Sequence, residues 1–503
     1  MRLAELSDAL PDGEARVAGG GTDREIADVA FDSRAVGPGA LFFCVRGSTA
    51  DGHDFAPAVV EAGAVALVVE RQLDVAVPQL VVPDSRAAMA PIAARFFGDP
   101  SAELRMIGVT GTNGKTTTAF LVRSILEEAG VRTGLLGTVK QVVGGAVEPV
   151  ERTTPEAIDL QRTFRRMLDA GDRACVMEVS SHALELGRAA AIHFDVAAFT
   201  NLTQDHLDFH PSMEDYFAAK RLLFVPADSG YRPAAAVVNV DDPYGRRLAA
   251  DLHPARGPRL TTFSAAGHLA DLSAREVTFD AAGGSFTLDA DGAIRPVRLQ
   301  LPGHFNVENA LAAVGSVLAL GVDLDEALAG LAAADPVPGR MEPVDEGQDF
   351  GVLVDYAHTP DSLENVLRAA RRLTSGELIC AFGCGGDRDP LKRPLMGRVG
   401  SELANLAVIT SDNPRSEDPD AIIAAILGGV ADDRRICVEV EPDRRAAIAL
   451  ALSRAQPDDL VVIAGKGHEQ GQEFGGGQKI PFDDRTVARE ELEKLATAER
   501  RPR

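Results

Sequence analysis

The feature that most constrains the fold is a loop rich in glycine and threonine, Gly108-Val-Thr-Gly-Thr-Asn-Gly-Lys-Thr-Thr117. An apolar run typical of a buried strand, Leu104–Val109, leads directly into it. A helical pattern follows the loop, with one apolar face formed by Ala119, Phe120, Ile125 and Leu126. Backbone N–H groups in such a loop, together with the helix N-terminus, attract phosphate. The unit therefore predicts a doubly wound α/β sheet that binds a nucleotide at its carboxyl edge.

Individual loop residues suit a polyphosphate. Lys115 can reach the outer phosphates, and Thr116 can hold Mg²⁺ through its hydroxyl. The spacing differs from the strict P-loop, because five residues rather than four separate Gly108 from Gly114. The residues predicted to bind ATP here are Gly111, Thr112, Asn113, Gly114, Lys115, Thr116 and Thr117.

The 503 residues divide into three blocks with α/β patterning, predicted as domains over residues 1–102, 103–337 and 338–503. Pro336-Val-Pro-Gly339 is the predicted linker before the third block. Late in the second block the apolar period changes to two around Gly283-Gly284 and Asp291-Gly292, which predicts antiparallel hairpins. Further strands are predicted at Ala40–Val45, Ala64–Val69, Gln79–Val82, Leu135–Val139, Ala174–Val179, Val196–Thr200, Ala236–Asn239, Val352–Asp355, Leu378–Phe382, Leu406–Ser411, Ile436–Val440 and Leu460–Ala464.

Composition excludes several classes of function. Lys and Arg total 51 against 75 Asp and Glu, so the net charge of −24 gives no general attraction to nucleic acid or anionic lipid. The best apolar run, Ala310–Val322, is too short to span a bilayer, and the N-terminus lacks an apolar signal core. The five cysteines do not suggest a disulfide framework. We expect a reduced, cytoplasmic protein that grips anions locally and inserts into no membrane.

Polar residues follow two more predicted strands of the second block. Glu178 and His206 are candidate Mg²⁺ ligands beside the phosphate loop. His182, Asp208 and His210 are candidates for a supporting role, and a packed structural role is an equal alternative. The helical pattern of Tyr216–Phe224 by itself puts Lys220 on the solvent side.

Two further sets of side chains suggest ligands. Asn306 and Asn309 lie one turn apart at a helix start, where they can cap the helix or read a purine edge. Loops that follow strands of the third block carry several cations on an otherwise acidic chain, and clustered cations predict an anionic substrate. These cations are Arg388, Lys392, Arg393, Arg415 and Lys466.

Over nearly its whole length the chain resembles the Mur ligases of peptidoglycan synthesis. The motifs that carry the resemblance are Phe31-Asp-Ser-Arg34 with Pro38-Gly39, the Gly-Lys-Thr-Thr loop, Met177–Leu184, Asp205–His210, Phe305–Ala310, Asp412-Asn-Pro-Arg415 and Gly465–Glu469. The phosphate loop alone would indicate only the wider superfamily, which includes folylpolyglutamate synthases. The Asp-Ser-Arg and Asp-Asn-Pro-Arg motifs narrow it to the members that add meso-diaminopimelate.

The resemblance implies three domains: a small α/β unit for the UDP sugar, a central P-loop-type ATPase with a hairpin extension, and a Rossmann-like unit for the amino acid. It implies ATP-dependent addition of meso-diaminopimelate to the D-Glu side chain of UDP-N-acetylmuramoyl-L-Ala-D-Glu, through an acyl phosphate. ATP, the UDP-muramoyl dipeptide and the amino acid are the expected partners, and the chain is expected to be monomeric.

The resemblance also assigns residues. By this resemblance the UDP sugar and its peptide are bound by Ser33, Arg34, Thr153, Thr154, Ser180 and Arg188. ATP falls, besides the loop, to Asn306, Asn309, Arg340 and Asp355. Lys115, Glu178, His206 and Lys220 are the catalytic set, and Mg²⁺ falls to Thr116, Glu178, His206 and Lys220, the last as a carbamate formed with CO₂ (N6-carboxylysine). Diaminopimelate falls to Arg388, Asp412, Asn413, Pro414, Arg415, Gly465 and Glu469.

Four alternatives remain open at this point. A lysine-adding ligase of the same fold is disfavoured by Arg415, which would face an ammonium without a carboxylate partner. A folylpolyglutamate-type ligase is disfavoured by the N-terminal Asp32-Ser-Arg34. A nucleotide-binding module without ligase chemistry is disfavoured by the intact Lys115, Glu178, His206 and Lys220. A kinase or GTPase switch would not explain the arginines of the third block.

Overall fold

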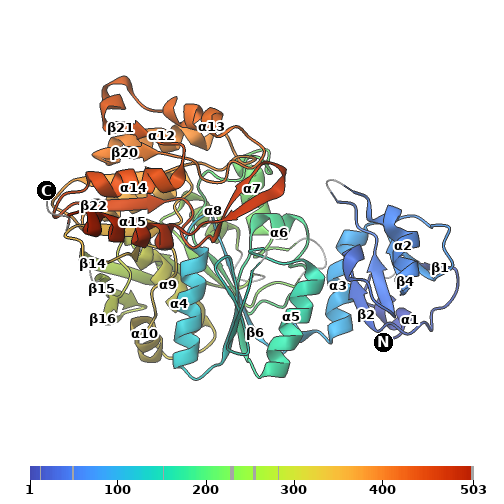
Figure 1. The fold of residues 1–503 in the computed structure, drawn as a ribbon. Helices are drawn as coiled ribbons and strands as arrows, with labels where there is room; N and C mark the ends of the chain where they lie inside the picture. The colour runs from blue at the N-terminus through green and yellow to red at the C-terminus, as the bar shows by residue number, and fades with distance from the viewer. Residues whose placement is uncertain are drawn as a thin grey trace.

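Apolar strands separated by amphipathic helices recur along the chain and assemble into three α/β units, each with its own sheet and apolar core (Figure 1). The computed structural model describes residues 1–499, apart from residues 12, 48–49, 151, 227–230, 253–256 and 281–282. The basic tail Arg500–Arg503, a small departure from the family pattern, lies outside the described residues. The predicted class, three α/β units in chain order, is confirmed.

The N-terminal unit is built on a five-stranded sheet in the order β1-β5-β4-β3-β2. Strands β2 to β5 run parallel, and β1 pairs antiparallel with β5. The strands are β1 (Arg16–Ala18), β2 (Asp28–Ala30), β3 (Ala40–Phe43), β4 (Ala64–Val69) and β5 (Gln79–Val81). The helices are α1 (Leu3–Ser7), α2 (Ala56–Glu61) and α3 (Ser85–Phe97), and α3 also packs on the central unit.

The central unit contains an eleven-stranded sheet in the order β16-β15-β14-β13-β12-β11-β6-β10-β7-β8-β9. Its middle is parallel from β7 to β14, and antiparallel strands extend both edges. The strands are β6 (Arg105–Thr110), β7 (Thr133–Leu136), β8 (Gln141–Val143), β9 (Ala146–Glu148), β10 (Ala174–Glu178), β11 (Val196–Phe199), β12 (Ala235–Asn239), β13 (Arg259–Ser264), β14 (Leu272–Asp280), β15 (Gly283–Ala290) and β16 (Ala293–Leu299).

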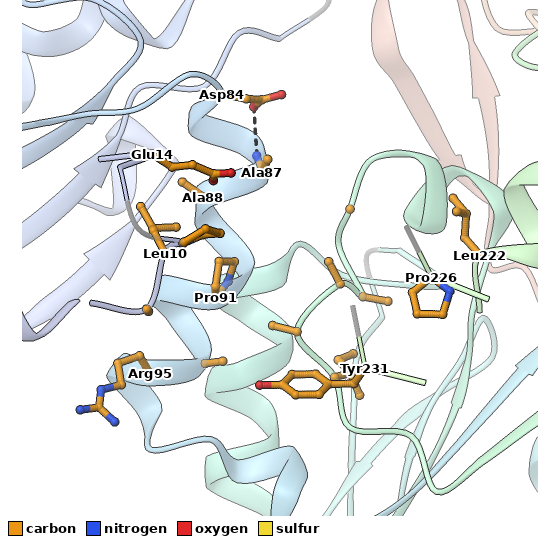
Figure 2. Close-up of a pocket in the computed structure, with 18 of the residues that line it drawn as sticks. Leu10, Glu14, Asp84, Ala87, Ala88, Pro91, Arg95, Leu222, Pro226 and Tyr231 are labelled. Atoms are coloured by element: carbon orange, nitrogen blue, oxygen red, sulfur yellow. Dashed lines mark hydrogen bonds between the residues drawn. The ribbon is translucent and has the colours of Figure 1, made fainter. Parts of the chain in front are cut away.

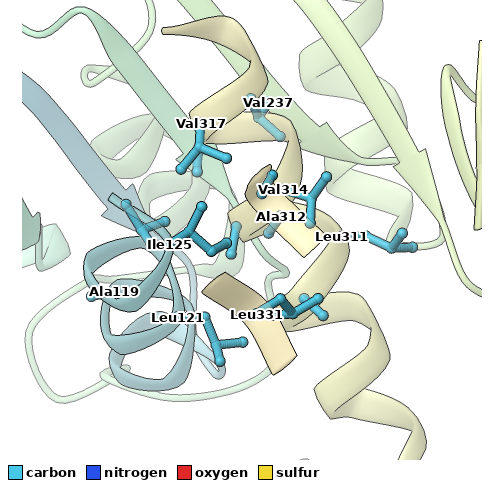
Figure 3. Close-up of a cluster of buried hydrophobic side chains, with 14 of the residues drawn as sticks. Ala119, Leu121, Ile125, Val237, Leu311, Ala312, Val314, Val317 and Leu331 are labelled. Carbon is cyan, nitrogen blue, oxygen red and sulfur yellow. The ribbon is translucent and has the colours of Figure 1, made fainter. Parts of the chain in front are cut away.

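Three helices pack against one another in the larger central core, as Figure 3 shows. Ala119, Leu121 and Ile125 of α4 (Lys115–Glu128) meet Val314 of α9 (His304–Ala319) and Leu331 of α10 (Leu324–Ala332) in this cluster. A second core includes apolar side chains of the helices α5 (Ala157–Ala170), α7 (Met213–Arg221) and α8 (Pro243–Asp251). The remaining helix of this unit is α6 (Ser181–Glu185). The sheet therefore has apolar packing on both faces, which leaves the strand ends for chemistry.

The C-terminal unit has a six-stranded sheet in the order β17-β18-β22-β19-β20-β21, parallel except for β17. Its strands are β17 (Glu342–Pro343), β18 (Gly351–Asp355), β19 (Leu378–Phe382), β20 (Leu406–Ile409), β21 (Val438–Val440) and β22 (Leu460–Ala464). Its helices are α11 (Pro360–Arg371), α12 (Lys392–Leu403), α13 (Pro419–Leu427), α14 (Arg444–Arg454) and α15 (Asp484–Glu499). A separate hairpin, β23 (Gly471–Phe474) with β24 (Gln478–Pro481), follows β22.

Several sequence predictions need correction. The strand predicted at Ile436–Val440 begins only at Val438, because Asp432–Cys437 form a 3₁₀ helix. The run Leu135–Val139 ends as a strand at Leu136. Pro336–Gly339 carries the chain between units, yet Val337 within it is fully buried, so this linker is packed against the protein. No helix in the described ranges is both long and apolar enough to cross a bilayer.

Candidate active site

The phosphate loop joins β6 to α4 and requires glycine at two positions. Gly111 has φ +148 and Gly114 has φ +87. A Cβ at Gly111 would lie 1.9 Å from Thr200 Oγ1, and one at Gly114 would lie 2.2 Å from Asn309 Oδ1. Both glycines therefore combine a left-handed backbone with a close approach that excludes any side chain.

Lys115 begins α4 and curls over the loop, where its Nζ donates to the carbonyl oxygens of Gly111 at 3.0 Å and Thr112 at 2.8 Å. Burial lowers the pKa of Lys115, because desolvation penalises the ammonium more than Glu178 and Asp205 favour it. The side chain is thus already placed over the loop that the sequence predicts to hold phosphate.

Glu178, at the end of β10, is the most heavily hydrogen-bonded candidate ligand. Its Oε2 accepts from Thr116 Oγ1 at 3.1 Å and from Thr138 Oγ1 at 3.0 Å, and its Oε1 accepts from Thr138 N at 2.8 Å. A Cβ at Gly137 would lie 2.4 Å from Glu178 Oε1, so the chain turns here on a glycine. Sequence reasoning missed Thr138, although a Gly-Thr pair after β7 lies at the same carboxyl edge.

Lys220 lies inside the protein, which corrects the pattern-based prediction of a solvent-facing side chain. It is 1% exposed, its Nζ donates to Gly111 O at 2.8 Å, and it lies 4.6 Å from the centre of the Tyr216 ring. Its pKa falls well below the ordinary value, because burial and the neighbouring Lys115 both disfavour the ammonium. The helical pattern of Tyr216–Phe224 missed this because the side of α7 that carries Lys220 faces the phosphate loop rather than solvent.

His206 adopts a left-handed backbone with φ +57 beside Lys220. Burial lowers its pKa to about 3, against the opposing effect of Asp205. The imidazole is therefore neutral at physiological pH, the state in which a histidine binds metal. His206 also packs edge-on against His182, with ring centres 5.0 Å apart.

The three candidates for a supporting role, His182, Asp208 and His210, lie in different environments. The His182 ring packs on Phe209 at 4.0 Å and on His210 at 5.7 Å. His210 contacts Ser181 Oγ through Nε2 at 2.9 Å and stacks on Tyr216. Asp208 is exposed. His182 packs on His206 and on His210, so both histidines support the His206 ring. The exposed Asp208 makes no such contact in the described structure.

Thr116, Glu178, His206 and Lys220 offer hydroxyl, carboxylate and imidazole groups, a donor set that suits a hard cation when Lys220 carries a carboxylate. Among the described residues, no group of three His, Cys, Asp or Glu side chains forms a metal cage. Thr116 Oγ1 and Glu178 Oε2 lie 3.1 Å apart, so these two oxygens fit a Mg²⁺ ion that also binds phosphate and water.

The C-terminal unit closes over this edge of the central sheet. Arg340 Nη2 donates to Thr116 Oγ1 at 3.1 Å, and Asn113 Nδ2 donates to Asp361 Oδ2 at 2.7 Å. The buried Asp205 has Lys392 Nζ at 3.6 Å and His358 Nε2 at 3.8 Å. The two units thus share one polar interface around the phosphate loop.

The other residues predicted to contact ATP are partly committed to the protein. Asn306 donates to Pro302 O at 2.7 Å, and Asn309 donates to Asn306 Oδ1 at 3.1 Å, so both amides stabilise the start of α9. Asp355 accepts from Met341 N and Ala357 N, at 2.7 and 2.8 Å. Asn309 Oδ1 nevertheless lies against Gly114, beside the loop.

Four of the residues predicted to bind the UDP-sugar peptide gather next to Glu178. Thr153 Oγ1 lies 3.0 Å from Thr138 Oγ1, Thr154 Oγ1 donates to Glu178 O at 2.9 Å, and Ser180 N donates to Thr154 Oγ1 at 3.1 Å. Arg188 donates to Thr154 O at 3.1 Å.

Ser33 and Arg34 belong instead to the N-terminal unit, just after β2, where Asp32 accepts from the guanidinium and backbone of Arg34. The Arg34 side chain holds the pKa of Asp32 down at about 2. Glu156 links this unit to the central one, because it pairs with Arg86 of α3 at 3.2 Å and with Arg188 at 2.9 Å.

The residues predicted to bind the amino acid lie mainly on two loops of the C-terminal sheet. Asn413 Nδ2 donates to Glu469 Oε2 at 2.9 Å, and Lys466 Nζ donates both to Asn413 Oδ1 at 2.8 Å and to Glu469 Oε2 at 2.9 Å. A Cβ at Gly465 would lie 2.6 Å from Asp412 Oδ2. Asp412 and Pro414 are buried in the same loop.

Most of the cations predicted to bind the anionic substrate are paired with carboxylates of the protein. Lys392 pairs with Asp205, Arg393 with Glu417 at 2.8 Å, and Lys466 with Glu469. Buried charges require partners, and these three find them within the protein. Arg388 is exposed and bonds to Asp387 O, and the half-buried Arg415 is paired through Nε with Glu473 at 2.9 Å.

A cavity of about 990 Å³ lies away from these residues, between α3 and a wall that includes Leu222, Pro226 and Tyr231 (Figure 2). None of the residues predicted for the site lines it. The phosphate loop lies instead at the interface between the central and C-terminal units, where Arg340 and Asp361 contact it.

Comparison with known proteins agrees with this architecture. Family models for the Mur ligase family catalytic domain, the Mur ligase middle domain and the Mur ligase glutamate ligase domain match residues 25–97, 109–317 and 339–467. The chain belongs to the Mur ligase family.

Two relatives named UDP-N-acetylmuramoyl-L-alanyl-D-glutamate–2,6-diaminopimelate ligase span nearly the whole chain. The protein from Geobacillus kaustophilus (strain HTA426) is 48% identical over 472 residues, 93% of this chain and 95% of the relative. The protein from Streptomyces coelicolor (strain ATCC BAA-471 / A3(2) / M145) is 48% identical, covering 98% of this chain and 96% of the relative. A solved structure with the same name is 32% identical, with a TM-score of 0.67 and 99% of both chains covered.

Mycobacterium tuberculosis folylpolyglutamate synthase complexed with ADP shares the fold. It has a TM-score of 0.61 at 19% identity, and the match covers 83% of this chain and 95% of that chain.

Proposed function

We propose that this chain adds meso-diaminopimelate to the D-Glu side-chain carboxylate of UDP-N-acetylmuramoyl-L-Ala-D-Glu, at the expense of ATP. The observation that carries the proposal is the docking of the C-terminal unit, which contains Asp412–Arg415, on the central unit. Arg340 and Asp361 contact Thr116 and Asn113 of the phosphate loop, and Lys392 pairs with Asp205. Near-full-length relatives carry the name of this ligase, which supports the same reaction here.

In the first step the γ-phosphate of ATP passes to the D-Glu carboxylate. A bond forms between a carboxylate oxygen and the γ-phosphorus, the bond to the β,γ-bridging oxygen breaks, and ADP leaves. The backbone of the loop from Gly111 to Gly114 cradles the phosphates, and Lys115 with Arg340 balances their charge. Mg²⁺ held by Thr116, Glu178, His206 and the Lys220 carbamate would supply further charge neutralisation at the phosphate oxygens.

In the second step an amine of meso-diaminopimelate attacks the acyl carbon. The tetrahedral intermediate loses inorganic phosphate and a proton, and a peptide bond results. Thr153, Thr154, Ser180 and Arg188 would hold the peptide next to Glu178, and Ser33 with Arg34 would bind the uridine diphosphate. Asn306, Asn309 and Asp355 would border the nucleotide.

Lys220 is well suited to carbamylation. Its depressed pKa leaves a fraction of neutral amine, which attacks the carbon of CO₂ and releases one proton to give a carbamate anion. Lys115 lies close enough to affect the pKa of Lys220 and would stabilise the new negative charge. The product replaces a buried cation by an oxygen donor for Mg²⁺.

Arg415 would select the amino acid. Its guanidinium would donate to the distal carboxylate of diaminopimelate, with Arg388, Asn413, Gly465 and Glu469 around the rest of the molecule. Lysine would leave Arg415 facing an ammonium, a mismatch that costs several kcal/mol in a closed pocket.

The test is phosphate release by the purified protein with ATP, Mg²⁺ and UDP-N-acetylmuramoyl-L-Ala-D-Glu, in parallel reactions with meso-diaminopimelate, L-lysine or no amino acid. We expect turnover only with meso-diaminopimelate. Turnover with lysine would overturn the role of Arg415. No turnover with either amino acid would point first to a folate-type ligase and then to an inactive nucleotide-binding protein.

We also propose the domain boundaries 1–102, 103–337 and 338–503, and a monomeric state. The family-model matches each fall within one of these ranges, which supports the boundaries. Light scattering coupled to size-exclusion chromatography tests the monomer, since a mass of twice 53.0 kDa would contradict it.

A further inference from the structure

The β23–β24 hairpin runs alongside the Asp412–Arg415 loop and is bonded to it at several points. Arg415 N donates to Glu473 O at 3.0 Å, Glu473 N donates to Asn413 Oδ1 at 3.0 Å, and Gln472 Nε2 donates to Asp412 O at 2.7 Å. The hairpin therefore fixes both the backbone and one side chain of the loop.

The Arg415 side chain is held at two of its nitrogens. Nε donates to Glu473 Oε2 at 2.9 Å, and Nη1 donates to Gly386 O at 2.8 Å. Nη2 has no hydrogen-bond partner in the described part of the chain. The hydrogen bonds on Nε and Nη1 therefore fix the direction in which the free Nη2 edge of the guanidinium points.

The backbone of Arg415 adds to this constraint. Its φ of +50 is a left-handed conformation that a non-glycine residue adopts only when the surroundings enforce it. The backbone bond to Glu473 O is one such contact. A Cβ at Gly385 would lie 3.0 Å from Arg415 Nη1. The absence of a side chain at Gly385 therefore leaves room for the guanidinium.

We propose that Glu473 is a positioning residue for amino-acid selection: it orients Arg415 so that the free edge of the guanidinium meets the distal carboxylate of the incoming amino acid. The inference rests on the proposed function. Arg415 would touch the substrate, and Glu473 would act through Arg415.

A competing role for Glu473, as an internal carboxylate that occupies Arg415 until substrate arrives, fits the geometry less well. A competitor would take the terminal Nη1–Nη2 edge, which suits a carboxylate in two parallel bonds. Glu473 instead accepts a hydrogen bond from Nε. The Nη1 group donates to a neutral backbone carbonyl, Gly386 O, and not to a carboxylate.

The experiment measures KM and kcat for meso-diaminopimelate in Glu473→Ala, Glu473→Gln and wild type. In Glu473→Ala we expect KM for meso-diaminopimelate to rise at least about tenfold, the size of one lost hydrogen bond to a charged group. We expect kcat and the KM values for ATP and the UDP-muramoyl dipeptide to change less than about threefold. The amide oxygen of Gln can still accept from Nε, so Glu473→Gln should return KM to within about threefold of wild type.

Glu439→Ala is the matched control, because Glu439 pairs with Arg454 at 3.0 Å in the same domain and is similarly exposed, at 34% against 41% for Glu473. It should leave every constant unchanged. An unchanged KM in Glu473→Ala, or a Gln variant as weak as the Ala variant, would overturn the positioning role while leaving the ligase function intact. Failure of wild type itself to use meso-diaminopimelate would instead reject the proposed function, and this inference with it.

Discussion

At the scale of single residues, burial changes what Lys220 can do. A solvent-exposed lysine is a permanent cation, whereas this one has a depressed pKa beside Lys115 and the phosphate loop. We predict that ¹³C-labelled bicarbonate gives a carbamate resonance in the wild-type protein and that Lys220→Met abolishes it, with at least a 100-fold loss of ligase activity. Lys140→Met, at a partly buried lysine outside the predicted site, is the control and should keep the resonance. A signal that persists in Lys220→Met would place the modification elsewhere.

His206 gives a prediction about pH. Its pKa is about 3 in the folded protein and near 6.5 in the unfolded chain, so between these values the unfolded state binds more protons. Its contribution to stability is therefore complete above pH 6.5 and is lost as the pH falls toward 3. We predict that His206→Asn, which tolerates the positive φ, shows a shallower loss of stability from pH 7 to 4.5 in urea titrations.

His304→Asn is the control with the opposite sign. A hydrogen bond to Glu308 raises the pKa of His304, so its stabilisation is present below pH 6.5 and declines above it. Identical pH profiles for wild type and His206→Asn would contradict the depressed pKa of His206.

The sequence was enough to select candidate site residues but not to predict their surroundings. The phosphate loop and Glu178 follow strands, so local pattern was enough to find them. Lys220 was misplaced by its helical period, because a buried lysine satisfied by a carbonyl 109 positions away leaves no local signal. The paired states of Lys392 and Arg393 likewise depend on Asp205 and Glu417, which are distant in the chain or on another loop.

At the scale of elements, α10 approaches α4 closely because of one glycine. A Cβ at Gly330 would lie 2.5 Å from Ile125 Cα, and Ser124 Oγ donates to Gly330 O at 3.0 Å. We predict that Gly330→Ala destabilises the protein by about 1–3 kcal/mol, because the close atom is backbone and the better helix propensity of Ala offsets only about 1 kcal/mol. Chemical denaturation measures this. Ala329→Gln, exposed on the same helix, should stay within about 0.5 kcal/mol, and an equally stable Gly330→Ala would show that the helices can separate.

The central strands of all three sheets were predictable because buried parallel strands read as continuous apolar runs. The edges were not. The short strands β8 and β9 and the polar β23–β24 hairpin carry little apolar signal, and their pairing is set by neighbours rather than by period. The hairpin is the more consequential omission, since it holds the loop around Arg415.

At the scale of the whole molecule, buried charges join the central and C-terminal units. Lys392 and Asp205 are 5% and 7% exposed, and removing one partner of such a pair costs about 3–5 kcal/mol when the other is left unpaired. His206 and His358 near Asp205 reduce that cost. We predict that Lys392→Met loosens the interface and increases the radius of gyration in small-angle X-ray scattering.

Lys494→Met is the control for scattering, because Lys494 is 65% exposed and pairs within its own helix. It should leave the radius of gyration unchanged. Addition of nucleotide and UDP-muramoyl dipeptide should reduce the radius of Lys392→Met toward that of wild type, since ligands that bridge the units favour the docked arrangement. An unchanged radius in Lys392→Met would mean that other contacts suffice to hold the units together.

The contact from Arg340 to Thr116 has a practical consequence for finding inhibitors. The central unit, which contains the whole phosphate loop, would present that loop without the guanidinium and without Asp361 on Asn113. Compounds screened against the isolated central unit would be ranked by binding to an uncovered phosphate loop, which the full-length enzyme does not expose in this way. Screens for this chain should use the full-length protein, because a compound that separates the two units would have to offset the loss of these interface contacts.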